Sequence, residues 1–120
     1  MNKLGIFQGI IIVKPLLFKF LKNPPQAMAL FPFILLKKLA FKEDKILINH
    51  ERIHFKQEVE LLIIPFYILY LLNYLINLLI YKNHYKAYLN ICFEREAYIN
   101  DRNLEYLKYR GFWTWVKYIL

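Results

Sequence analysis

The sequence predicts a mainly α-helical fold, and a short N-terminal hairpin or strand would make it α+β. Three observations predict the helices. Residues 45–64 contain no helix breaker, residues 61–81 are apolar and uncharged, and residues 86–109 contain neither Gly nor Pro. Before residue 43, prolines interrupt each apolar run. We therefore expect the helices after this point and irregular or extended structure before it.

Length and composition indicate one domain, residues 1–120, with an affinity for membranes. Apolar residues make up 58% of the chain, and the net charge is +8. This combination favours an anionic lipid surface, for which we expect the bacterial inner membrane. The basic residues are scattered singly among apolar ones and form no nucleic-acid-binding module, so no nucleic-acid partner is predicted. Cys92 is the single cysteine, which excludes an intrachain disulfide, and we expect it to be buried.

The first part of the chain is an apolar N-terminal segment, residues 1–25. It carries a short apolar run without a small-residue cleavage site, so we expect a retained segment that contacts the membrane. Prolines 24 and 25 end it. Residues 27–41 (AMALFPFILLKKLAF) suit a short edge strand or hairpin around Pro32, and a broken helix is the alternative.

A metal-site core is predicted over residues 44–110, and its first helix begins near Glu43 and Asp44. Asp44 is placed to cap the free backbone N–H groups of the first turn. Apolar and polar residues at spacings of three and four predict one inward stripe, made of Ile46, Leu47, His50, Ile53, His54, Gln57 and Leu61. Glu58 and Glu60 fall outside this stripe and are expected to be surface charges.

Residues 50–54 read HERIH, an HExxH motif. On a helix, His50 and His54 lie one above the other, so that both imidazoles can bind one Zn²⁺. Glu51 lies one step round, where it can act as general base on a metal-bound water. In a chain with three His and seven Glu, about 0.004 chance matches are expected. The motif therefore predicts a zinc site.

A catalytic zinc site needs a third protein ligand. His84 is the one remaining histidine, and the sequence FEREAY offers Glu94 or Glu96. These two glutamates lie about 200° apart on a helix, so that one of them can face the metal. Periodicity does not choose between them.

The motifs resemble those of a known group of metallopeptidases. HERIHFKQ matches the HExxHxxQ form of bacterial zinc metallopeptidase-like families, and Glu94 to Ala97 match the ExxA element of gluzincins. Residues 45–105 thus look like small Bacteroidota proteins of mini-gluzincin type. The resemblance implies a zincin-like minimal core with His50, His54 and Glu94 as ligands.

The resemblance also implies partners for these ligands. Many membrane gluzincins carry an Asp four residues after the ligand Glu, where this chain has Tyr98. Asp101, one turn further, is the expected replacement. Gln57 is a further candidate for a hydrogen bond to a ligand.

Residues 61–81 are long enough to cross a membrane, but the motifs on either side argue against a single crossing. It would separate His54 from Glu94 by about 30 Å, whereas ligands of one ion must meet. We therefore expect the segment to turn back, near Asn73 and Asn77 or at residues 82–85, with both ends on one side of the membrane. The tail FWTWVKYIL is typical of a membrane interface.

These features predict a membrane-associated zinc metallopeptidase that hydrolyses a peptide or protein substrate, with Glu51 as base. The alternative is a non-enzymatic membrane-associated protein with a structural or vestigial metal site. A third hypothesis is a basic membrane-surface adaptor without a metal.

Overall fold

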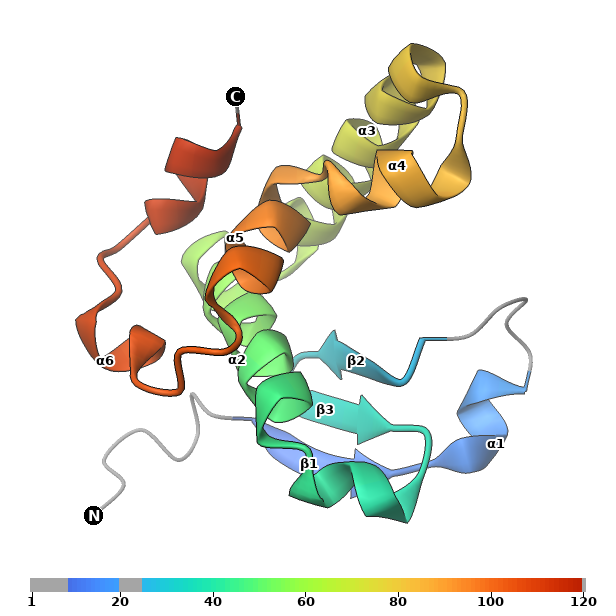
Figure 1. Cartoon of the computed structure of the whole chain (residues 1–120), viewed down its shortest axis with the longest axis vertical. Helices are drawn as coiled ribbons and strands as arrows, with labels where there is room; N and C mark the ends of the chain where they lie inside the picture. The colour runs from blue at the N-terminus through green and yellow to red at the C-terminus, as the bar shows by residue number, and fades with distance from the viewer. Residues whose placement is uncertain (1–8, 20–24, 120) are drawn as a thin grey trace.

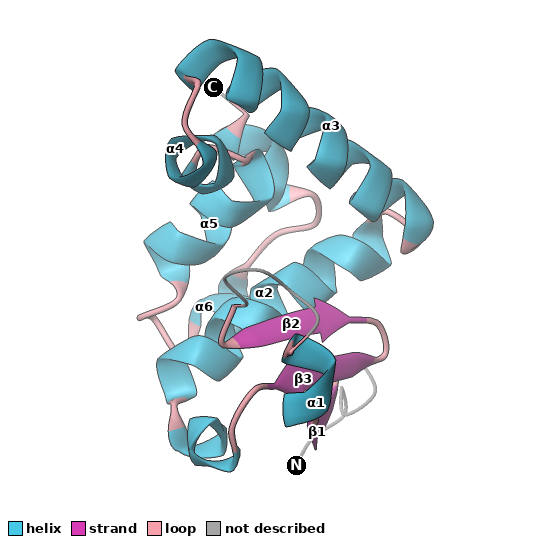
Figure 2. Cartoon of the chain, turned by 90° about the vertical axis from the view of Figure 1, so that its right-hand side faces the viewer, coloured by secondary structure: helices cyan, strands magenta, loops and turns pink. Residues whose placement is uncertain are grey.

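The computed structural model describes residues 9–19 and 25–119, and within them the chain is mainly helical with one three-stranded sheet (Figure 1). Helix α2 is central: it packs against strand β2 on one side and helix α5 on the other (Figure 2). The elements are β1 (Ile10–Val13), α1 (Pro15–Phe18), β2 (Ala27–Leu30), β3 (Phe33–Leu36), the 3₁₀ helix η2 (Leu39–Glu43), α2 (Lys45–Glu60), α3 (Ile64–Tyr81), α4 (His84–Leu89), α5 (Cys92–Asn100), α6 (Tyr106–Tyr109) and the 3₁₀ helix η3 (Thr114–Tyr118).

The sheet contains the predicted hairpin. Strands β2 and β3 pair antiparallel, and the turn between them contains a cis Phe31–Pro32 peptide bond. Strand β1 adds to the other side of β3 in parallel, which gives the order β1-β3-β2 and leaves β2 at the edge beside α2. The sequence did not predict β1, which lies in the apolar segment 1–25; residues 1–8 and 20–24 of that segment are outside the described residues.

Helix α2 begins where the sequence predicted, because the Asp44 side chain accepts a hydrogen bond from the backbone N–H of Leu47. Most of the predicted stripe is buried, but Ile46 is 37% exposed and does not face inward. The helix ends at Glu60, four residues before the predicted end, because Leu62 and Ile63 have positive φ angles of 61° and 74°. This turn redirects the chain, and Pro65 then lies in the first turn of α3.

The chain reverses its direction at the polar turn after α3. Lys82 takes the left-handed conformation and ends α3, and the Asn83 side chain accepts a hydrogen bond from the N–H of Lys86 to cap α4. Helices α3 and α4 therefore form a helical hairpin, which confirms the turn predicted at residues 82–85 rather than the one near Asn73. The hairpin brings the chain back to α2, so that the two halves of the predicted site can meet.

The single helix predicted over residues 86–109 is wrong: three shorter helices, α4, α5 and α6, occupy this range. The first break is at Ile91, whose backbone is extended, and the N–H of Cys92 then donates a hydrogen bond to Asn73 Oδ1 on α3. A long-range acceptor thus stabilises the start of α5. This break sets the orientation of α5 independently of α4.

Two buried clusters stabilise the fold. One lies between the sheet and α2 and contains Ala27, Ile34, Leu36 and Ile48. The other joins α3, α5 and the C-terminal segment and contains Leu61, Phe66, Ile91, Cys92, Phe93 and Trp115. Cys92 is buried as predicted, whereas Trp115 of the tail packs in the core instead of extending from the molecule.

The C-terminal segment is fastened by a buried ion pair network. Arg110 pairs with Glu96 on α5 and with Glu60 at the end of α2, at 2.6 Å from Glu60 Oε2. The side chains of all three are at most 7% exposed. Glu96 also accepts a hydrogen bond of 2.7 Å from the Tyr106 hydroxyl. Glu60 is therefore not the surface charge that the sequence suggested.

We predict that Arg110→Ala destabilises the protein by about 3–5 kcal/mol, because two carboxylates would be left buried without their cation. Lys108→Ala is the matched control, since Lys108 pairs with Glu105 through side chains that are 66% and 59% exposed. That pair should contribute less than about 1 kcal/mol. Urea unfolding followed by circular dichroism measures both values, and equal losses would contradict the prediction.

Candidate metal centre

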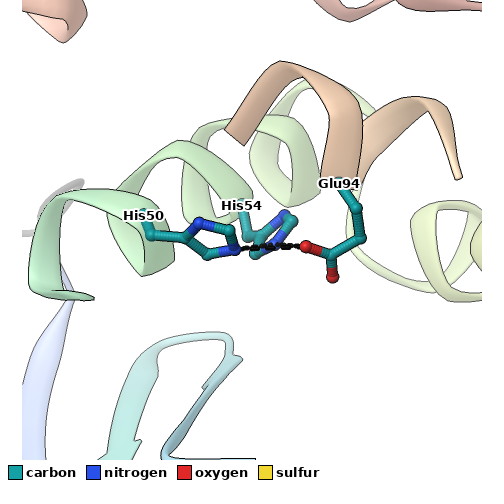
Figure 3. A group of neighbouring side chains, drawn as sticks. All are labelled: His50, His54 and Glu94. Carbon is teal, nitrogen blue, oxygen red and sulfur yellow. Dashed lines mark hydrogen bonds and ion pairs between the residues drawn. The ribbon is translucent and has the colours of Figure 1, made fainter. Parts of the chain in front are cut away.

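His50, His54 and Glu94 converge in the space between α2 and α5 (Figure 3). The two histidines lie one helical turn apart on the inner face of α2, and Glu94 lies in the first turn of α5. Each of these residues is at most 6% exposed. The structure thus brings the three predicted ligands into one buried group that could hold a metal ion.

The three ligand atoms form a nearly equilateral triangle. His50 Nε2 lies 3.1 Å from Glu94 Oε1, His54 Nε2 lies 3.0 Å from the same oxygen, and the two nitrogens are 3.2 Å apart. Ligands placed 2.0–2.1 Å from a tetrahedral ion are separated by about 3.3 Å. The triangle is therefore close to the size that a tetrahedral ion requires.

Hydrogen bonds on the far side of each imidazole determine where its proton lies. His50 Nδ1 is 3.0 Å from Asp101 Oδ2, and His54 Nδ1 is 2.9 Å from Gln57 Oε1. The Gln57 amide is oriented by two acceptors, because its nitrogen donates to Phe93 O and to Glu96 Oε1. Since both partners are acceptors, each Nδ1 carries the proton. The lone pairs of both Nε2 atoms then point into the triangle, as metal binding requires.

Tyr70 was not predicted from the sequence, yet it contacts a ligand directly. Its hydroxyl on α3 donates a hydrogen bond of 2.6 Å to Glu94 Oε2, the oxygen outside the triangle. This bond fixes the rotation of the carboxylate and leaves Oε1 directed at the histidines. The sequence distance between Tyr70 and the HExxH motif does not predict this contact with Glu94, because the contact depends on how α3 packs.

The three ligand residues are buried, and the Glu94 carboxylate places a negative charge among them. Burial lowers the pKa of His54, but the neighbouring Glu94 carboxylate outweighs burial and raises that pKa to about 10. Burial raises the pKa of Glu94, yet His54 and His50 hold it well below its usual range. Without a metal ion, a proton on His54 therefore neutralises Glu94 through their ion pair. The group could therefore hold either this proton or a metal ion.

Glu51 lies next to the triangle without taking part in it. It is 6% exposed, and burial raises its pKa, while His54 and His50 lower it in part. The backbone amide of Ala29 on β2 also stabilises its charged form. Glu51 thus occupies the position beside the ligands that the HExxH motif predicts for a base.

Two hollows meet at Glu51. One, of about 280 Å³, has an apolar lining and contains His54 and Glu94 on its wall. The other, of about 640 Å³, contains His50. Both also border on Pro25, Ala27 and Tyr88. The candidate centre therefore borders both hollows, which together we call the cleft.

The remaining candidates lie outside the triangle. Glu96, the alternative ligand, binds Arg110, Tyr106 and Gln57 with its two oxygens. His84 lies at the end of the hairpin, with Nδ1 2.8 Å from the Tyr74 hydroxyl. Tyr98 packs edge-on against His50 at 4.4 Å between ring centroids, but its hydroxyl bonds to Tyr88 and not to a ligand. Asp101 is the residue that orients His50.

Glu58 is buried, although the sequence suggested a surface charge. Its Oε1 accepts hydrogen bonds from the backbone N–H of Phe31 and from the Tyr67 hydroxyl, at 3.1 and 3.0 Å. Oε2 has no partner among the described residues, and burial raises the pKa of Glu58 to about 7. Glu58 thereby ties the turn after β2 and helix α3 to α2, and it lines the smaller hollow. This contact could not be predicted from the sequence, because Phe31 and Glu58 are 27 residues apart.

Comparisons of the chain with family models, with curated proteins and with solved structures found no match. The resemblance to mini-gluzincins therefore remains a prediction from the motifs. What the structure adds is the meeting of His50, His54 and Glu94 in one buried group.

We predict that Glu94→Gln lowers the affinity for Zn²⁺ at least about 100-fold, because a charged ligand is lost from a site that has three. Glu105→Gln removes an exposed carboxylate and should leave the affinity unchanged. Competition with a chromophoric chelator measures both. An unchanged affinity in Glu94→Gln would remove Glu94 from the ligand set.

We also predict that Asp101→Asn weakens Zn²⁺ binding by about 10- to 100-fold, a range typical of residues that orient a ligand histidine. An amide at this position can present its nitrogen to His50 Nδ1, which disfavours the tautomer with a free Nε2. The same competition assay detects the change, with thermal melting as a check of the fold. A wild-type affinity would show that Asp101 does not orient His50.

Proposed function

We propose that this protein is a zinc-dependent peptidase with a zincin-like minimal core. The observation that carries the proposal is the arrangement of His50, His54 and Glu94 with a buried carboxylate, Glu51, beside them. A ligand set of two histidines and one glutamate is found in hydrolytic zinc sites, which keep a fourth position for water. The cleft at Glu51 supplies access to that position.

In the proposed reaction, Glu51 moves the proton. Zinc, when bound, lowers the pKa of a water molecule and polarises the scissile carbonyl. The Glu51 carboxylate accepts the proton of the attacking water and passes it to the leaving amine. Glu51 points about 100° away from His50 around the helix, so it contributes little to holding the metal. Asp101, Gln57 and Tyr70 keep the ligands oriented during this step.

The edge strand supports a peptide as substrate. Strand β2 pairs with β3 on one side and borders the cleft on the other, where Ala27 lines both hollows. An extended peptide can add to such an edge through main-chain hydrogen bonds. Apolar side chains of the peptide would suit the smaller hollow, which is lined by Met28, Phe66 and Tyr67.

The alternative function is a structural metal site in a protein without enzymatic activity. The burial of all three ligands favours it, because structural sites are closed to solvent. A structural site has no use for a base at Glu51. This residue therefore separates the two functions.

We predict that Glu51→Gln retains zinc and stability but cleaves a peptide library about 10²–10⁴-fold more slowly, because it removes the base and keeps the size of the side chain. Cleavage is followed by mass spectrometry of the products. Glu43→Gln, an exposed glutamate just before α2, is the matched control and should cleave at the wild-type rate. A wild type that binds zinc and cleaves nothing would favour the structural site.

A further inference from the structure

Helix α3 has two chemically opposite faces. Five of its polar side chains face the rest of the protein and form hydrogen bonds there: Tyr67 with Glu58, Tyr70 with Glu94, Asn73 with the N–H of Cys92, Tyr74 with His84 and Asn77 with Ala87 O. Asn73 and Asn77 would argue against contact with hydrocarbon if their amides were exposed to it. The structure removes that objection, because both amides are used inside the protein.

The opposite face of α3 is purely aliphatic. We call the outer face the set of side chains that are at least 45% exposed: Ile64, Ile68, Leu71, Leu72, Leu75, Ile76, Leu79 and Ile80. At 100° per residue they cover about half of the helix circumference, over a length of about 27 Å. Of the 18-residue helix, 11% is buried, and among the described residues it is the one helix long and apolar enough to cross a membrane. An exposed apolar surface of this size marks an interaction site.

We propose that the outer face of α3 lies in the interfacial region of an anionic lipid bilayer, with the helix axis parallel to the membrane plane. This inference does not depend on the proposed enzymatic function. It rests on the sidedness of α3, on the residues that tie α3 to the protein, and on charge.

The contacts of α3 favour a helix in the membrane plane over one that crosses the membrane. Tyr67 and Tyr70 tie its first half to the candidate centre, and α4 covers its second half. The hairpin ends in exposed polar residues, among them Lys82 and Lys86. A crossing would carry these charges through hydrocarbon, whereas an in-plane helix leaves them at the level of the headgroups.

Charge favours lipid over a second copy of this chain as the partner. The chain has 17 basic and nine acidic residues, so two copies repel each other, while anionic headgroups attract each copy. Lys82 directly follows α3, at the end of the outer face, and is exposed, so that it can contact phosphates. The partner that fits both the aliphatic face and the charge is an anionic bilayer.

Flotation of the full chain with lipid vesicles tests the proposal. The protein should float with vesicles of phosphatidylcholine and phosphatidylglycerol at 7:3, and at least tenfold less with phosphatidylcholine alone. The triple variant L72Q/L75Q/L79Q should lose binding at least tenfold. The matched control L39Q/I99Q/L104Q changes three aliphatic side chains that are 49–69% exposed on other elements, and it should bind as the wild type does.

A second measurement keeps the result independent of folding. A fluorophore sensitive to depth is attached to Ile68→Cys, Leu72→Cys or Leu79→Cys in a Cys92→Ser background and quenched by lipids brominated at defined depths. Equal depth at the three positions is expected for an in-plane helix. A depth that is greatest at Leu72 would indicate a crossing and overturn the proposal. So would a protein that ignores both kinds of vesicle and sediments as a dimer that L72Q/L75Q/L79Q dissociates.

Discussion

The rest of this structure depends on one constraint: three ligand atoms direct their lone pairs at one another. With the Nδ1 protons held by Asp101 and Gln57, the Nε2 atoms of both histidines and Oε1 of Glu94 meet within 3.2 Å. Such a meeting is repulsive until a cation lies between the atoms. The ordered hydrogen bonds around the triangle hold the ligands in place for that cation. A metal ion is one such cation, and a proton on His54 is another.

The fold meets this constraint by bending the chain sharply between the two ligand-bearing helices. Leu62 and Ile63 take positive φ angles, which cost a non-glycine residue about 1–2 kcal/mol each. Burial of Leu61 and Phe66 beside the turn offsets this cost. The bend sends α3 outward, the hairpin returns the chain, and α5 then places Glu94 opposite His54. The strained turn is thus a consequence of joining α2 to α5 through a long apolar helix.

Interactions between residues that are close in the sequence could be predicted, whereas interactions between distant residues could not. Asp44 as a cap, the spacing of His50 and His54, and the turn after Lys82 rest on contacts within one helical turn, and these are confirmed. Glu94 could be chosen over Glu96 from a motif resemblance, but periodicity could not make that choice. The start of α5 depends on Asn73, which is 19 residues away in the sequence, and the orientation of Glu94 depends on Tyr70.

Charged residues were the least predictable for the same reason. From the sequence, Glu58 and Glu60 are expected to be surface charges and Glu96 is an alternative metal ligand, because their actual partners lie far away along the chain. In the structure Arg110 pairs with Glu60, 50 residues earlier in the chain, and Phe31 in the turn after β2 donates its N–H to Glu58. A partner of this kind offsets the free-energy cost of burying a carboxylate. It can be identified once the fold is known, because it is distant in the sequence.

Helix α3 connects the two chemical properties of this protein. Its inner face supplies the hydroxyl that orients Glu94, and its outer face is aliphatic. One helix diameter, about 10 Å, therefore separates the ligands from whatever covers the outer face. Asn73 and Asn77 point inward and form hydrogen bonds there, so the outer face contains no polar side chain without a partner.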